Sequence, residues 1–276
     1  MRSKSKGGKG RAKKALGKVR PKSLDGGPAD LRPTVAIYDL TDCEGCELAF
    51  VPIVEKVVRG AKIVEWRLGQ ERKIPLKDGE KIAVSFVEGS PMTLEDRELM
   101  KDLRERSAVI VSFGSCACVG GVPSLADREL REKFMALVYS PEYKPKSDIP
   151  AEPLDRTIKV DYYLHGCPVL PETVEWFLEQ VLIGKKPDKF GGYPVCLACK
   201  EKENNCLLLE GKPCLGPVSA GNCGAPCPTF GKICYGCTGK VKGANIPQMR
   251  QELIKILGSE KAADEHMRIF LKDWKQ

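Results

Sequence analysis

Cysteine is the residue type most able to do chemistry in this chain, which has 13 cysteines among 276 residues. The odd number argues against a closed set of disulfides, and a chain of this length does not need disulfides to fold. The cysteines are clustered, and three pairs have the spacing Cys-x-x-Cys. This pattern indicates metal binding in a reducing compartment, and we expect the cytoplasm.

Four cysteines are expected to follow buried strands directly, at positions Cys43 and Cys46 (DCEGCE), Cys116 (GSCACVGG) and Cys167 (HGCP). The carboxyl ends of parallel strands meet at one edge of a sheet, so residues far apart in sequence would converge there. Four thiolates at one edge form a tetrahedral sulfur cage that suits zinc or an iron–sulfur cluster.

Glycines in the same loops support such a cage. Gly120 and Gly121 permit positive φ and leave backbone N–H groups free to face sulfur atoms. This turn favours Cys116 as the ligand and leaves Cys118 as the spare cysteine. Cys46 begins the next expected helix, whose dipole would favour an anionic cluster.

A second group of eight cysteines lies within residues 196–237. The surrounding segment, 191–240, is rich in Gly, Pro and Cys and has little hydrophobic periodicity, so metal binding would supply its folding energy. Eight cysteines make two complete sets of four, and their spacing is equally compatible with zinc and with iron–sulfur clusters. They are Cys196, Cys199, Cys206, Cys214, Cys223, Cys227, Cys234 and Cys237.

The elements that would position these cysteines alternate between strand and helix over residues 33–185. This alternation predicts an α/β fold with a flavodoxin-like, doubly wound parallel sheet. The expected strands are 34–40, 62–68, 82–87, 108–113 and 159–164. The expected helices are 47–59, 94–106 and 171–182, with two more after residue 247. An exposed, proline-rich excursion is expected at 141–153.

We divide the chain into a disordered basic tail (1–32), the flavodoxin-like domain (33–190), a cysteine-rich domain (191–240) and a C-terminal helical extension (241–276). Residues 1–22 hold ten Lys and Arg and no acidic residue. The net charge is +8, and removing these ten from 45 basic residues leaves 35 against 37 acidic ones. The body therefore has no basic excess, and we expect a solvated tail and no nucleic-acid partner.

Several other classes of protein are excluded. No stretch approaches the roughly 18 consecutive apolar residues of a spanning helix, so membrane insertion is not expected. There is no Walker A sequence, no G-x-G-x-x-G fingerprint and no Ser-His-Asp arrangement, so we expect no nucleotide cofactor. Three metal cages without a substrate apparatus predict an electron carrier.

The motifs resemble those of the small subunits of cytoplasmic nickel–iron hydrogenases. Among these, the delta subunits of sulfhydrogenases and the small subunits of methyl-viologen-reducing hydrogenases are the most similar. The resemblance covers roughly residues 33–240. It rests on the combination of DCEGCE, FVEGS, GSCACVGG, HGCP, PVCLAC, CLGPVSAGNCGAPCP and CYGCTG.

The resemblance implies three 4Fe–4S clusters in a row. Cys43, Cys46, Cys116 and Cys167 match the proximal ligands. Cys196, Cys199, Cys206 and Cys214 match the distal ligands, with Cys196 where exported relatives have histidine. Cys223, Cys227, Cys234 and Cys237 match the medial ligands, where exported relatives have three cysteines and a 3Fe–4S cluster.

The resemblance also implies an oxidoreductase subunit that does not itself react with hydrogen. The nickel–iron centre would belong to a large subunit. This chain would pass electrons between that centre and a further acceptor subunit or a ferredoxin-like carrier. Glu88 matches a family position near the proximal cluster. His165 precedes a proximal ligand and is expected either to support that ligand or simply to end its strand.

Two alternative functions remain open at this point. The chain could be the iron–sulfur subunit of a related redox complex that is not a hydrogenase. A respiratory complex I subunit of this fold would be expected to end near the fourth proximal ligand and to carry one cluster. The second alternative, from another class, is a zinc-stapled interaction protein. A brown protein after anaerobic purification would indicate iron–sulfur clusters, and a colourless one would indicate zinc.

Overall fold

The computed structural model describes residues 32–69, 74–144, 149–187 and 192–271. The basic tail predicted for residues 1–22 lies outside these ranges. Among the described residues, no helix combines the length and the apolar character needed to cross a membrane.

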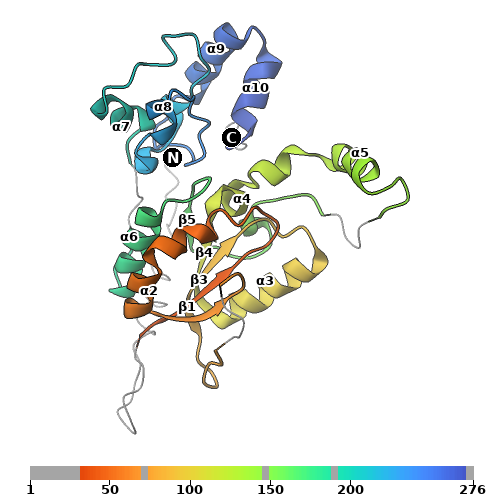
Figure 1. Ribbon diagram of the computed structural model, residues 1–276, viewed down its shortest axis with the longest axis vertical. Coiled ribbons are helices and arrows are strands. Elements are labelled where there is room, and N and C mark those ends of the chain that lie inside the picture. Colours follow the sequence, from red (N-terminus) through yellow and green to blue (C-terminus); the bar gives the residue numbers. More distant parts are fainter. Residues whose placement is uncertain (1–31, 70–73, 145–148, 188–191, 272–276) are drawn as a thin grey trace, which may run out of the picture.

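A five-stranded parallel sheet forms the first part of the protein (Figure 1). Its strand order, β2-β1-β3-β4-β5, is that of flavodoxin, which confirms the predicted fold class. The strands are β1 (Thr34–Tyr38), β2 (Lys62–Trp66), β3 (Ile82–Glu88), β4 (Ser107–Phe113) and β5 (Tyr162–Leu164).

Helices cover both faces of this sheet (Figure 1). The 3₁₀ helix η1 (Glu47–Ile53), α2 (Val54–Gly60) and α6 (Pro171–Leu182) pack on one face, and α3 (Leu94–Arg106) packs on the other. The remaining elements between the strands are α4 (Gly114–Val119), η2 (Val122–Leu125), α5 (Arg128–Val138) and η3 (Leu154–Arg156).

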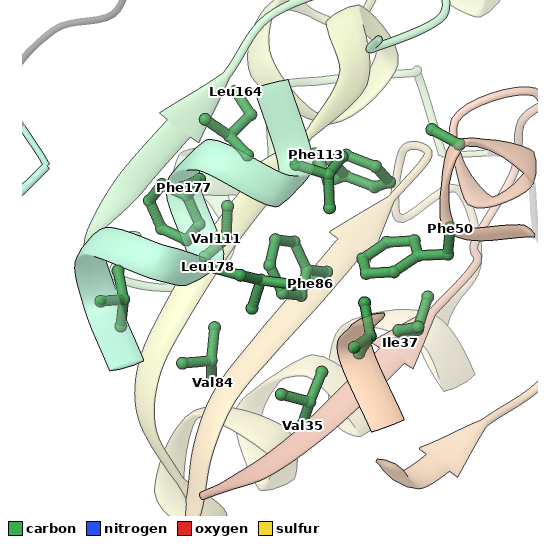
Figure 2. Close-up of a cluster of buried hydrophobic side chains, with 14 of the residues drawn as sticks. Val35, Ile37, Phe50, Val84, Phe86, Val111, Phe113, Leu164, Phe177 and Leu178 are labelled. Atoms are coloured by element: carbon green, nitrogen blue, oxygen red, sulfur yellow. The ribbon is translucent and has the colours of Figure 1, made fainter. Parts of the chain in front are cut away.

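Aromatic side chains fill the core beneath η1 and α6 (Figure 2). The ring of Phe86 lies edge-on to three neighbours, with centroids 5.1 Å from Phe50, 5.5 Å from Phe113 and 5.8 Å from Phe177. These rings come from two strands and two helices. They therefore fix η1, which follows the first cysteine loop, against the sheet.

The segment predicted as one helix at 47–59 differs from the prediction. It begins as the 3₁₀ helix η1 and continues as α2. Pro52 lies inside η1 and lacks the N–H that an α-helix would use there. The tighter turn buries Ala49 and Phe50 and leaves Leu48 and Val51 exposed, although these last two lie at helical spacing in the sequence.

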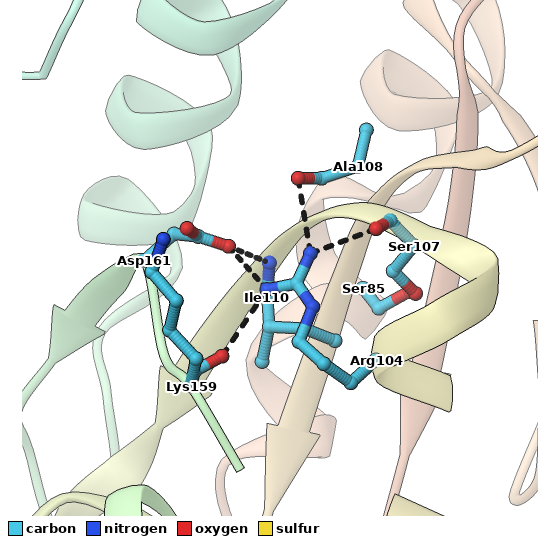
Figure 3. Close-up of polar contacts among 7 residues, drawn as sticks. All are labelled: Ser85, Arg104, Ser107, Ala108, Ile110, Lys159 and Asp161. Carbon is cyan, nitrogen blue, oxygen red and sulfur yellow. Dashed lines mark hydrogen bonds and ion pairs between the residues drawn. The ribbon is translucent and has the colours of Figure 1, made fainter. Parts of the chain in front are cut away.

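The last strand is shorter than predicted because of a polar network at its start (Figure 3). Arg104 donates to Asp161 Oδ2 at 2.5 Å and to the Ser107 carbonyl at 2.7 Å. The Asp161 carboxylate also accepts the Ile110 N–H at 2.9 Å. A continuing strand would bond that N–H through its main chain. The network anchors β5 beside β4 and so helps to position Cys167 at the far end of β5.

The cysteine-rich segment is built from short helices and turns, consistent with the little regular structure predicted for it. The two helices expected near the end, α9 and α10, pack against each other and bury Leu215 and Val218. This C-terminal lobe lies beside the cysteine-bearing loops of the sheet (Figure 1). Its elements are α7 (Val195–Glu201), η4 (Gly216–Val218), η5 (Gly221–Cys223), α8 (Pro226–Thr229), α9 (Ile246–Leu257) and α10 (Glu260–Arg268).

Candidate functional site

The four cysteines predicted at strand ends lie together at the carboxyl edge of the sheet. Cys43 and Cys46 come from the loop after β1, Cys116 from α4, and Cys167 from the loop after β5. Burial, together with the neighbouring Cys167 and Cys43 thiols, raises the pKa of Cys116 to about 12. Burial likewise raises the pKa of Cys46. Thiols this close resist ionisation unless a cation compensates their charge, which is what a metal cluster supplies.

Glycine makes room for these sulfurs. A Cβ atom at Gly114 would lie 2.4 Å from Cys46 Sγ, and Gly114 has a φ of +84°. A Cβ atom at Gly121 would lie 2.9 Å from the Cys116 backbone and 3.1 Å from its Sγ. Gly121 also has the predicted positive φ, of +45°. Side chains at either position would overlap the cysteine cage.

Glu88 braces the first cysteine loop from within. Its carboxylate accepts the Cys46 N–H at 2.9 Å and the Glu47 N–H at 2.6 Å. Burial raises the Glu88 pKa to about 7. The helix dipole predicted to favour a cluster at Cys46 thus faces the Glu88 carboxylate of the same chain. The Gly120 N–H, predicted to face cluster sulfurs, instead donates to the Cys116 carbonyl at 2.9 Å, so that part of the prediction is wrong.

Two further residues that the sequence did not single out support these loops. Ser90 donates its hydroxyl to the Cys116 carbonyl at 3.1 Å. Glu47 is fully buried and accepts the Trp66 indole N–H at 2.9 Å. Burial raises the Glu47 pKa to about 7. These contacts join residues 19 and 26 positions apart, and no local motif marks them.

Cys118 has different partners from Cys116. Its Sγ donates to the Ser112 carbonyl and accepts the Ser112 hydroxyl, each at 3.4 Å. Burial raises its pKa to about 12. These contacts turn Cys118 toward the end of β4, which supports its assignment as the spare cysteine.

We expect Cys118→Ser to retain every cluster and Cys116→Ser to lose or alter the proximal one. Cys118 already has protein partners for its sulfur, whereas the thiol of Cys116 neighbours those of Cys167 and Cys43. Electron paramagnetic resonance of both variants, with iron analysis, measures the outcome. Equal damage in the two variants would contradict the assignment of the spare.

A second group of cysteines surrounds a cavity of about 320 Å³ in the C-terminal lobe. The main chain of Gly236 hydrogen-bonds to Cys234, as amides do around cluster sulfurs. The cavity is lined by Cys223, Cys227, Cys234 and Cys237, together with Cys167 of the first group.

The remaining four cysteines line a smaller cavity of about 30 Å³ next to the second group: Cys196, Cys199, Cys206 and Cys214. Burial and the three other thiols raise the pKa of Cys196 to about 11. Asn204 Nδ2 donates to Cys199 Sγ at 3.7 Å, and the Cys234 N–H donates to Cys214 Sγ at 3.3 Å. Among the described residues, no three His, Cys, Asp or Glu side chains meet as ligands of one metal ion.

His165 lies between the first and second groups. Its ring is stacked with Tyr163, with centroids 6.4 Å apart, and lines the larger cavity. A Cβ atom at Gly239 would lie 3.2 Å from this ring, so the imidazole packs directly on the Gly239 backbone. His165 thus contacts the C-terminal lobe as well as ending its own strand.

Comparison with known proteins places this chain in a family. Residues 43–181 match the family described as "NADH ubiquinone oxidoreductase, 20 Kd subunit". Sulfhydrogenase 2 subunit delta of Pyrococcus furiosus is 34% identical over 83% of this chain and 95% of its own length. A subunit of the F420-non-reducing hydrogenase vhu of Methanocaldococcus jannaschii is 30% identical over 75% of this chain and 81% of its own. A chain of a solved NAD+-reducing NiFe hydrogenase in the H2-reduced state has a TM-score of 0.48 and 23% identity, covering 57% of this chain and 95% of that chain.

Proposed function

We propose that this chain, which belongs to the family of the NADH ubiquinone oxidoreductase 20 Kd subunit, is the electron-transfer subunit of a cytoplasmic nickel–iron hydrogenase. The chain is also related to hydrogenase subunits, which makes it an oxidoreductase subunit. It would hold three 4Fe–4S clusters on its twelve grouped cysteines. It would carry electrons between a large subunit and an outside acceptor, and would not itself react with hydrogen.

The position of the middle group of cysteines carries this proposal. Its cavity is lined by Cys167 of the first group. On the other side, the Cys234 N–H donates to Cys214 Sγ of the third group. The three groups therefore form a continuous row. This supports the assignment of the groups, in order from the sheet, as the proximal, medial and distal sites.

Bound iron–sulfur clusters accept and release single electrons at potentials that their surroundings set. The chain's contribution is to hold and enclose them. Cys46, Cys214 and Cys234 are buried, which limits water around the sulfurs. Backbone amides hydrogen-bond to several cysteine sulfurs, including Cys46 from Val169 and Cys234 from Gly236. Such bonds stabilise the anionic state of a cluster.

The surface around the proximal site supports docking of a large subunit. Cys43 and Cys167 are exposed at the sheet edge. Apolar side chains nearby in sequence are also exposed, with 56% of Leu48, 54% of Val51 and 52% of Val122 accessible to solvent. Apolar surface beside a redox site is typical of a protein interface. Of the segments Cys43–Glu47 and Gly114–Gly121, we expect the exposed Cys43 and Glu44 to be covered there, because Glu47 and most of Gly114–Gly121 are already buried within this chain.

Replacing Cys196 with serine tests the direction of this row. In the complex with the large subunit, Cys196→Ser should reduce electron transfer to the outside acceptor by more than tenfold. Hydrogen–deuterium exchange, which needs only the large-subunit site, should stay unchanged. The matched control is Cys118→Ser, which should keep both activities. An equal loss of both activities in Cys196→Ser would contradict the distal assignment, and hydrogen evolution by the isolated chain would contradict the electron-carrier role.

A related redox complex without nickel is the second candidate, because the matching family is described by a subunit of NADH ubiquinone oxidoreductase. Eight cysteines lie beyond residue 181, where that match ends. A subunit with one cluster would not need them. Nickel analysis of the purified complex separates the candidates, since one nickel per complex supports the hydrogenase and none supports the alternative.

A further inference from the structure

Ser115 occupies the junction between the proximal and medial groups. It precedes Cys116 and is almost completely buried, with 1% of its surface exposed. Its hydroxyl lies 2.6 Å from the Cys237 carbonyl and 2.9 Å from the Gly166 carbonyl. The Ser115 N–H donates to the same Gly166 carbonyl at 2.8 Å. One small side chain of the Cys116 loop therefore contacts two further cysteine-bearing loops, and the contact to Cys237 spans 122 positions of sequence.

Two other contacts occur at the same junction. The main chain of Cys167, a proximal cysteine, faces the thiol of Cys237, a medial cysteine. The His165 ring also packs on Gly239, two residues beyond Cys237. The segments 165–167 and 237–239 thus lie against each other. The Ser115 hydroxyl contacts both segments through their main chains.

This arrangement depends on the hydroxyl group. The Cys237 carbonyl is held by the Ser115 hydroxyl in a partly buried setting, and removing this donor leaves the carbonyl without it. Removing the Ser115 hydroxyl alters no cysteine thiol and no backbone N–H group, so the ligands themselves stay in place. What would change is how tightly residue 237 is held against residue 167.

We propose that Ser115 is a positioning residue for electron transfer, holding the medial ligand Cys237 against the proximal ligand Cys167. The inference rests on the proposed function, because it requires clusters at both groups. Electron tunnelling falls steeply with separation, so a loosened junction would slow transfer between the two clusters without removing either. This positioning role neither breaks nor forms a covalent bond.

The test uses the full chain in its complex with the large subunit, as wild type, Ser115→Ala, Ser115→Thr and Ser85→Ala. Ser85→Ala is the matched control, since it removes another fully buried hydroxyl, one that lies 2.7 Å from the Ser107 hydroxyl within the sheet. The readouts are iron content, the magnetic interaction between the reduced clusters in electron paramagnetic resonance, and hydrogen exchange of residues 234–239.

We expect Ser115→Ala to keep its full iron content and to show a weaker interaction between clusters. Hydrogen exchange at 234–239 should be about fivefold faster, as for the loss of one hydrogen bond. Ser115→Thr, which keeps the hydroxyl, should match wild type, and Ser85→Ala should keep the cluster interaction.

A wild-type interaction and exchange rate in Ser115→Ala would overturn the inference and leave the proposed function intact. A wild type without proximal and medial clusters would overturn the proposed function itself. If Ser115→Ala loses iron, Ser115→Thr and Ser115→Val decide, because they have the same shape and differ in the hydroxyl. A cluster interaction that is kept in Ser115→Thr and weakened in Ser115→Val supports the positioning role of Ser115. Equal interactions in the two variants overturn it.

Discussion

Replacing Gly114 with alanine is expected to abolish the proximal cluster and remove about four iron atoms per chain. The new Cβ atom would lie 2.4 Å from Cys46 Sγ, closer than any non-bonded contact allows. The backbone cannot relax cheaply, because φ at this position is +84°, where a side chain costs roughly 1–2 kcal/mol. Iron analysis and electron paramagnetic resonance of the purified variant measure the loss.

Gly79→Ala provides the control for this result. Gly79 has a similar φ of +76°, but a Cβ atom there would meet nothing within 4 Å. The Gly79→Ala variant should therefore be destabilised by backbone strain alone, and it should keep its iron. If Gly114→Ala also retained a normal proximal signal, the four cysteines would not form the crowded cage described above.

Replacing Phe86 with alanine should destabilise the protein by about 3–5 kcal/mol. The ring is fully buried and lies edge-on to Phe50, Phe113 and Phe177, so its removal leaves a cavity that these rings cannot fill. At about 2–4 °C per kcal/mol, the thermal unfolding midpoint should fall by roughly 6–20 °C. Anaerobic thermal unfolding followed by circular dichroism measures this change.

Phe134→Ala is the matched control, because it removes the same ring from the surface of α5, where 54% of the side chain is exposed. Its effect should stay within about 0.5 kcal/mol. Similar midpoints for the two variants would mean that the aromatic cluster does not hold the first cysteine loop in place.

Much of the fold was predictable because buried strands of a parallel sheet have continuous apolar sequences. The runs around Ile37, Val84 and Val111 identified their strands, and the alternation with helices predicted a parallel sheet with helices on both faces. Local pattern failed where one residue changes the geometry or where a distant side chain intervenes. Pro52 shifted the buried face of η1, and Asp161 shortened β5 by accepting a bond from β4.

The cysteine groups were predictable for a related reason. Parallel strands bring their carboxyl ends to one edge, so Cys116 and Cys167 could be assigned to one site although they are far apart in sequence. The supporting contacts were not predictable. The bonds of Glu88 to the Cys46 loop and of Ser115 to Cys237 depend on how loops pack in three dimensions. Spacing alone also left zinc and iron–sulfur clusters equally open.

The most direct measurement of the central claim is the metal and sulfide content of the full chain, purified without oxygen. Three 4Fe–4S clusters on twelve cysteines predict about twelve iron atoms and about twelve acid-labile sulfides per chain in a brown protein. Stoichiometric zinc in a colourless protein would contradict the electron-carrier role. Iron for one cluster only would contradict the row of three clusters.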